Sequence, residues 1–229
     1  MSAPTLSPTT GEPVEVVGRR NRVGLLFFII ADLSGSLALI ISYSYLWSLN
    51  VNGAWAPANT TYDNANNVTG RTALPWAPDW PFWAVLALTV VATLLMWWGY
   101  RGIRAGRVGQ LTAGAALSTV VILGSIVLQW WQMSTFPFDA TNGAYASAVL
   151  LMTGSALVHL FLVGFLVLGV TLRTRAGAIT ADNHSQARLV NYYMAWICAS
   201  LLLSCLVTTF MKASPNVNPP VFGSFSTQK

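Results

Sequence analysis

Two ionisable side chains fall inside long apolar stretches of this chain and are its first candidates for chemistry. Asp32 and His159 lie near the middle of such stretches, whereas the other charged residues lie at their edges or between them. A charge within a bilayer is costly and usually serves a function. A carboxylate there is either protonated or paired with a donor, and Asp32 and His159 are suitable partners for each other. Two interpretations stay open: a proton relay, or hydrogen bonds that hold neighbouring helices in register.

Redox metal chemistry needs more ligands than this sequence offers. A buried haem with two protein ligands usually needs two His, or a His and a Met, and a copper site of the haem–copper type needs three His. His159 is the one His within an apolar stretch, because His184 falls in a polar connection, and Cys198 and Cys205 form no Cys-x-x-Cys pair. We therefore expect no metal, no cofactor other than lipid and no catalytic residue in this chain.

Two further sets of polar residues flank the apolar stretches. Gln129 and Gln132 are three residues apart, so they share one helix face, and we expect them to hydrogen-bond lipid headgroups and loops near the membrane surface. Arg101, Arg104 and Arg107 lie together in a short connection, where they suit the anionic headgroups of phospholipids. Bound phospholipid is therefore the one ligand that we expect.

The composition places these residues in a membrane. Of the 229 residues, 54% are hydrophobic and only 8% are charged, against about 25% charged residues in typical soluble domains. The mean hydropathy is +0.56. Soluble enzyme folds are thereby excluded. The net charge of +5 does not indicate nucleic acid as a partner, because long apolar runs interrupt the basic residues and prevent a continuous phosphate-binding face.

Five apolar stretches are long enough to cross a bilayer as helices, which takes about 20 residues. The predicted fold is therefore all-α, a polytopic membrane protein whose five transmembrane helices lie at 23–47, 80–100, 110–131, 144–172 and 190–211. These helices belong to one transmembrane domain at 19–211. Residues 1–18, rich in Pro, Ser and Thr, are expected to form a disordered tail, and 212–229 an external tail. We expect the long connection at 48–79 to be an outer loop, either ordered or covered by a partner.

The basic residues are distributed unevenly between the two sides of the predicted bundle. Nine of the twelve lie on one side, namely Arg19, Arg20, Arg22, Arg101, Arg104, Arg107, Arg173, Arg175 and Arg188. The positive-inside rule then places the N-terminus in the cytoplasm and the C-terminus outside. Tryptophans near the helix ends, Trp55 among them, are interpreted as anchors at the membrane interface.

Motifs on four of the predicted helices resemble subunit III of haem–copper cytochrome c oxidases in its five-helix bacterial form. Residues 28–32 (Phe-Ile-Ile-Ala-Asp) resemble the family's Phe-Ile-x-Ser-Glu, and 42–46 (Ser-Tyr-Ser-Tyr-Leu) its Ala-Tyr-Phe-Tyr-Leu. Residues 129–132 (Gln-Trp-Trp-Gln) resemble Gln-x-x-Glu, with an amide in place of the acid. Residues 153–159 retain Thr-Gly and the last His of Thr-Gly-x-His-x-x-His, and 192–197 retain the aromatic residues of Tyr-Trp-His-Phe-x-Asp but neither its His nor its Asp.

The resemblance implies an accessory subunit with no redox centre of its own. Asp32 takes the position of the family's buried glutamate. In this family, subunit III packs on the catalytic subunit I, binds lipid, and supports proton uptake or oxygen access, while haem and copper lie in partner subunits. The implied location is the bacterial cytoplasmic (inner) membrane. Because Ala156 replaces one family His, and the last motif lacks its His and Asp, the family's polar cluster is here reduced to Asp32 and His159.

Two hypotheses from other functional classes of protein stay open beside the accessory subunit. The first is a small transporter or channel that uses Asp32 and His159 as a proton relay. Transporters contain interrupted helices near the bilayer midplane, and no Pro lies in the centre of any predicted span, which disfavours this hypothesis. The second is a membrane enzyme that acts alone.

Overall fold

The structure, a computed structural model, describes residues 11–64 and 68–216. The predicted architecture is confirmed: the chain is mostly helical, with five helices that are long and apolar enough to span a membrane. They are α1 (Val14–Leu49), α2 (Trp80–Arg104), α3 (Val108–Ser134), α4 (Ala144–Arg175) and α5 (Ser185–Phe210). The protein is therefore a multi-pass membrane protein.

Helix α1 begins nine residues earlier than the sequence predicted. It starts at Val14, directly after Pro13, so residues 14–18 of the expected disordered tail are helical. A proline is well tolerated at a helix start, and Glu15 in the first turn interacts favourably with the positive end of the helix dipole. Arg20 and Glu12 also form an ion pair of 2.9 Å. Residues 1–10 of that tail lie outside the described residues.

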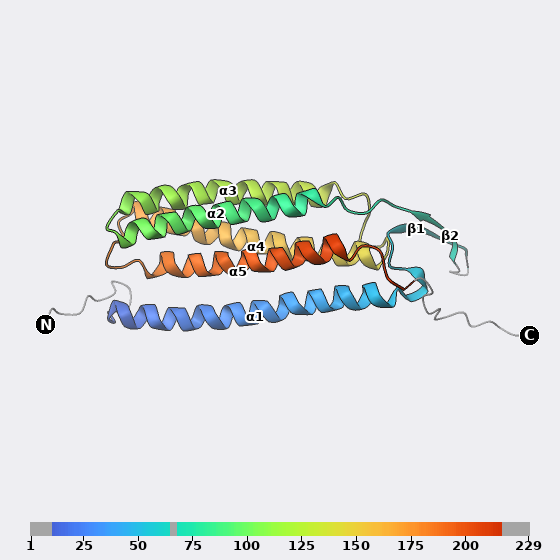
Figure 1. Ribbon diagram of the computed structural model, residues 1–229, viewed down its shortest axis with the longest axis horizontal. Helices are drawn as coiled ribbons and strands as arrows, with labels where there is room; N and C mark the ends of the chain where they lie inside the picture. Colours follow the sequence, from blue (N-terminus) through green and yellow to red (C-terminus); the bar gives the residue numbers. More distant parts are fainter. Residues whose placement is uncertain (1–10, 65–67, 217–229) are drawn as a thin grey trace, which may run out of the picture.

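The five helices lie side by side along one long axis (Figure 1). Consecutive helices alternate in direction, because each connection returns the chain to the next helix at the same end. We call the end at which α1 finishes the hairpin end and the end at which α1 begins the arginine end. In Figure 1, α1 lies along one side of the molecule next to α5, and α3 lies on the opposite side.

Glycines allow α2 and α3 to pack closely against each other. An added Cβ at Gly114 would lie 2.6 Å from the carbonyl oxygen of Leu95 and 2.8 Å from the Cα of Gly99. The turn between the two helices contains Gly106, whose φ of +78° favours glycine. The α2–α3 pair is the most extensive helix contact in the structure.

Helix α1 packs against α4 and α5 and contributes little to the core. Only Gly18 and Tyr43 are buried among its 36 residues, all of which the structure describes. Phe27, Ile41 and Tyr45 are among its exposed side chains. An apolar helix of this kind is suited to lipid or to a neighbouring protein, because hydrocarbon solvates its side chains well.

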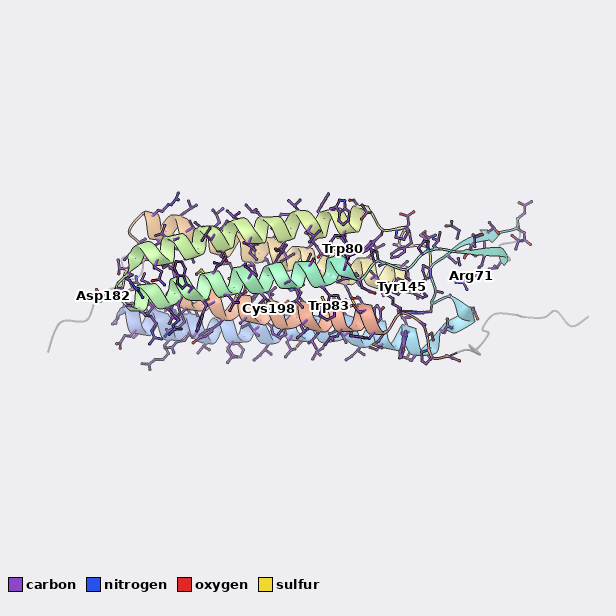
Figure 2. The ribbon with its side chains drawn as sticks, turned by 45° about the horizontal axis from the view of Figure 1, so that its top comes forward. Arg71, Trp80, Trp83, Tyr145, Asp182 and Cys198 are labelled. Atoms are coloured by element: carbon purple, nitrogen blue, oxygen red, sulfur yellow. The ribbon has the colours of Figure 1, made fainter. Side chains whose placement is uncertain are left out.

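The described residues of the connection from α1 to α2 form an element that was not predicted from the sequence. Strands β1 (Ala58–Tyr62) and β2 (Val68–Ala73) form an antiparallel hairpin with an irregularity between Thr61 and Tyr62. The hairpin extends beyond the helices, and Figure 2 shows Arg71 on it. The backbone N–H of Ala58 donates to Asn142 in the α3–α4 connection at 2.7 Å, which fixes the base of the hairpin.

A cluster of aromatic side chains closes the hairpin end of the bundle. Trp55, interpreted above as an interface anchor, is 1% exposed, and its ring meets that of Tyr43 edge-on with centroids 5.0 Å apart. Tyr145, visible at this end in Figure 2, contacts both rings. The interface interpretation of Trp55 was therefore wrong, because its ring is buried against Tyr43 and Tyr145 and its indole N–H bonds to the chain itself.

The start of the predicted C-terminal tail belongs to this cap. The carbonyl of Lys212 accepts a hydrogen bond from the indole N–H of Trp55, and that of Ala213 accepts one from Trp47 at 2.7 Å. The ammonium group of Lys212 also lies 2.6 Å from Asp79 at the start of α2. Residues 212–216 are thus bound to α1 and α2, and 217–229 lie outside the described residues.

Candidate functional site

The structure brings Asp32 and His159 together in the interior of the α1 interface. Nε2 of His159 lies 2.7 Å from Oδ1 of Asp32, and the indole N–H of Trp196 donates to Oδ2 at 2.6 Å. The side chains of Asp32 and His159 are only 18% and 14% exposed. One carboxylate of α1 is therefore bonded to both α4 and α5, and we call these three residues the Asp32 triad.

The positions of these residues along their helices explain why they meet. Asp32 lies at the middle of α1, and His159 lies at the middle of α4. Trp196 also lies near the middle of α5. Because every residue of a helix adds the same rise along its axis, residues halfway along adjacent spanning helices come to the same depth.

The hydrogen bonds fix how many protons the triad holds. Nδ1 of His159 lies 2.8 Å from the carbonyl oxygen of Ser155, which can only accept, so Nδ1 carries a proton. The contact between Nε2 and Oδ1 then needs one more proton, located either on the imidazole or on the carboxyl group. Asp32 and His159 therefore form either an ion pair or a neutral pair. These two states differ only in the position of one shared proton.

Trp196 is a partner of Asp32 that was not predicted from the sequence. As one of the aromatic residues of a family motif, it gave no sign of a hydrogen-bond role. Its position was nevertheless a signal, because Trp196 falls inside the predicted span at 190–211, away from the interfaces where most tryptophans were expected. An indole N–H in hydrocarbon needs an acceptor, and Asp32 was the one carboxylate predicted at that depth.

Gln129 and Gln132 lie in the bundle interior and do not face lipid headgroups. They are 2% and 1% exposed, and Nε2 of Gln129 donates to the carbonyl of Thr153 on α4 at 3.3 Å. Neither amide atom of Gln132 has a hydrogen-bond partner among the described residues. The expectation of headgroup contacts was wrong because it considered depth along the helix alone, whereas this face of α3 is covered by α4.

The three arginines are exposed at the arginine end, but only Arg107 lies in the connection to α3, because Arg101 and Arg104 belong to the last turn of α2. The guanidinium group of Arg101 lies over the ring of Trp97, 4.9 Å from its centroid. Trp97, Trp98, Arg101 and Arg107 line a shallow groove of about 350 Å³. Arg104 is exposed next to this groove and does not line it. The arrangement places cationic groups beside apolar rings, which suits an amphipathic ligand with an anionic head.

Metal-ligating residues do not gather in the part of the chain that the structure describes. Within 11–64 and 68–216, no three His, Cys, Asp or Glu side chains lie close enough to hold an ion. His184 lies at the arginine end, where Nδ1 contacts the carbonyl of Ala181 and the ring lies near that of Tyr100. The Asp32 triad itself can supply hydrogen bonds and the movement of one proton.

Comparison with known proteins gives a distant relative. No protein-family model matches the chain. The chain is similar to cytochrome c oxidase subunit 3 of Yarrowia lipolytica, with 21% identity over 178 residues. The match covers 76% of this chain and 61% of the relative, so the chain spans less than two thirds of the length of the protein it matches. The similarity suggests a distant relationship to this subunit.

Proposed function

We propose that this protein is an accessory, non-redox subunit of a haem–copper terminal oxidase, related to subunit III of cytochrome c oxidase. The observation that carries the proposal is the similarity over 76% of the chain to a subunit 3 of that enzyme. The family motifs support it, because they fall on α1, α3, α4 and α5 in the order in which the family has them. The five membrane-spanning helices agree with a five-helix member of this family.

In this role, the protein packs on the catalytic subunit, which contributes the haem and copper. Exposed glycines support such packing: a Cβ added at Gly24 or Gly35 of α1, or at Gly124 of α3, would meet no atom within 4 Å. Small residues on an exposed helix face let the backbone of another membrane helix approach closely. The bound protein would maintain proton uptake or oxygen access in the catalytic subunit, as subunit III does in its family.

Phospholipid is the ligand that we propose for the chain itself. The groove beside Arg101 and Arg107 combines charge with tryptophan rings, and Arg104 adds a third cationic group nearby. The headgroup would lie at the guanidinium groups and the acyl chains along α2 and α3. A high-resolution map of the purified protein without lipid density along these helices would contradict this assignment.

The proposed location is the bacterial cytoplasmic membrane, with the arginine end in the cytoplasm. Nine of the twelve basic residues fall on this side of the spans, which is the asymmetry that the positive-inside rule describes. The β1–β2 hairpin would then lie outside. Labelling of a single cysteine introduced at Thr60 of the hairpin by a membrane-impermeant reagent in intact cells would support this orientation, and protection of that cysteine would contradict it.

A second candidate function is a small transporter or channel with Asp32 and His159 as its proton relay. The contact of 2.7 Å between the two side chains and their single shared proton favour it. Asp32→Asn separates it from the first proposal, because an amide keeps the hydrogen bonds and cannot exchange the proton.

Purification from the native membrane tests the oxidase proposal. The chain, with an affinity tag, is extracted in a mild detergent and its companions are identified by mass spectrometry. We expect a haem–copper catalytic subunit in constant ratio to the chain, together with a haem Soret band. The chain separated from its companions by a harsher detergent should show no Soret band. Two results together would contradict the proposal: the chain is recovered alone under mild conditions, and oxidase activity is intact in membranes that lack the chain.

A further inference from the structure

A second polar layer lies one helical turn from the Asp32 triad, toward the hairpin end. Each member of the triad has a serine four residues away on its own helix. The pairs are Asp32 and Ser36 on α1, Ser155 and His159 on α4, and Trp196 and Ser200 on α5. Residues four apart lie on the same face of a helix, so the three serines face the same junction as the triad.

These serines line a cavity in the α1 interface. The cavity has a volume of about 10 Å³, and its polar lining consists of His159, Ser36, Ser155, Ser200 and Ser204. A single water molecule needs about 10–15 Å³ measured in this way and two to four polar partners. The cavity is therefore of the right size for one water and too small for a larger ligand.

The hydrogen bonds around the cavity leave hydroxyl groups available to a ligand. The hydroxyls of Ser36 and Ser200 lie 3.2 Å apart and bond to each other. Within the described residues, the hydroxyls of Ser155 and Ser204 make no hydrogen bond. Both ring nitrogens of His159 already have partners. A polar guest would therefore bind to the serines and not to the imidazole.

We propose that this cavity, which we call the serine cavity, is a binding site for one water molecule that links α1 to α4 and α5. The water donates to and accepts from serine hydroxyls of all three helices, and so satisfies the hydroxyls of Ser155 and Ser204. Buried waters of this kind are integral parts of protein folds, with about three hydrogen bonds each.

The water gives the α1 interface a bond that can adjust. A direct contact such as that between Asp32 and His159 is lost when the helices shift apart, whereas a bridging water moves with its partners. The proposal is independent of the oxidase assignment, because it concerns contacts within this chain.

Oxidation by hydroxyl radicals tests the proposal in the full chain. Radicals made by X-ray radiolysis of water oxidise methionines that have water within reach. Met152 lines the serine cavity and is 4% exposed, while Met96 and Met194 are fully buried and do not line it. In the purified wild-type protein we expect Met152 to be oxidised at least about three times faster than Met96, because only Met152 has bound water beside it. Equal rates would overturn the proposal.

A substitution in the cavity ties the oxidation to this site. Ser155→Val fills the cavity and removes a hydroxyl that has no partner among the described residues, so it should lower the rate at Met152 to that at Met96. Ser34→Val, on the exposed face of α1, is the matched control and should leave the rate unchanged. An undiminished rate in Ser155→Val, or an equal fall in Ser34→Val, would overturn the proposal. If Ser155→Val does not fold, Ser155→Ala takes its place: it removes the same hydroxyl without adding volume and should also lower the rate at Met152.

Discussion

The α2–α3 interface and the α1 interface are held together by different forces. Helices α2 and α3 meet through glycines, so that the backbone at Gly114 touches Leu95 and Gly99 directly. Helix α1 is joined to α4 and α5 by hydrogen bonds. Asp32, at the middle of α1, bonds to both helices, and Ser36 bonds to α5. In lipid, where helices gain nothing from hiding apolar surface, close packing and interhelical hydrogen bonds are the two available ways to associate.

This difference implies different tolerance to change. Close packing fails when volume is added, because two backbones in contact cannot move apart without losing many dispersion contacts at once. A hydrogen-bonded interface fails when a donor or acceptor is removed, and it tolerates changes of volume better. Added volume should therefore damage the α2–α3 interface most, and the loss of a polar group should damage the α1 interface most.

The largest effect is expected from volume added between α2 and α3. Gly114→Ala places a Cβ within 2.6 Å of the Leu95 carbonyl oxygen, so the helices must separate. We expect the free energy of unfolding in mixed detergent micelles to fall by about 3 kcal/mol, the upper part of the usual cost of overpacking. Gly124→Ala, on the same helix with no atom within 4 Å of the new Cβ, is the control and should be neutral or slightly stabilising. Equal effects of the two substitutions would contradict the packing account.

A smaller loss is expected when the α1 interface loses its acceptor. Asp32→Leu leaves the N–H of Trp196 and the Nε2 of His159 without a partner, and interhelical hydrogen bonds in membranes contribute about 0.6–1.7 kcal/mol each. The free energy of unfolding should fall by about 2 kcal/mol. Hydrogen exchange should accelerate in α1 and stay unchanged in α2 and α3, because only the attachment of α1 is weakened. Recovery of the proposed oxidase complex should also decline.

Ser34→Leu provides the control for this experiment. Ser34 is exposed on α1, and its hydroxyl donates to the carbonyl of Ile30 in its own helix. It should leave the exchange of α1 amides as in the wild type. Faster exchange across all five helices in Asp32→Leu would contradict a local role of the triad.

A still smaller effect is expected at the serines. The bond between Ser36 and Ser200 is long, at 3.2 Å, and joins two neutral groups. Ser36→Ala should lower the free energy of unfolding by about 0.6 kcal/mol, the average for such bonds in a membrane protein. A double-mutant cycle with Ser200→Ala measures the coupling directly, and strictly additive effects would show that the two hydroxyls do not interact.

The sequence was sufficient to predict the five helices because a membrane span has a strong signal. Long runs of apolar residues between charged connections placed α4 and α2 at their observed first residues, 144 and 80. The start of α1 was predicted nine residues late, because Arg19, Arg20 and Arg22 interrupt the apolar run without interrupting the helix. Hydropathy marks where a helix enters the membrane, and it does not mark where the helix begins.

The faces of the helices were harder to predict than their positions. In a soluble helix, apolar residues mark the buried face, but in a membrane both the lipid-facing and the buried faces are apolar. Polar residues such as Gln129 and Gln132 then become the better sign of the interior. We assigned them to the membrane surface from their depth, and the structure has them buried between α3 and α4.

The candidate site was predictable in part, because polar residues within a span indicate the interior of a membrane protein. Asp32 and His159 stood out because charged residues are rare inside spans, whereas Trp196 was hidden among ten tryptophans. The β1–β2 hairpin was missed because the Pro and Asn residues of this connection indicated a loop, although its Thr residues favour strands. Its base depends on a bond from Ala58 to Asn142, which is distant in the sequence, and no local pattern reveals such a bond.

Asp32→Asn is expected to have the smallest effect of these substitutions. It also tests the account most directly. The amide can donate to Nε2 of His159 and accept from Trp196, so both bonds of the triad remain while the shared proton is removed. The measurement is the rate of oxygen consumption, per haem, of the proposed oxidase complex purified through the variant chain. We predict wild-type recovery of the complex and a rate close to wild type. A fully assembled complex with a strongly reduced rate would contradict the account and establish Asp32 as part of a proton path.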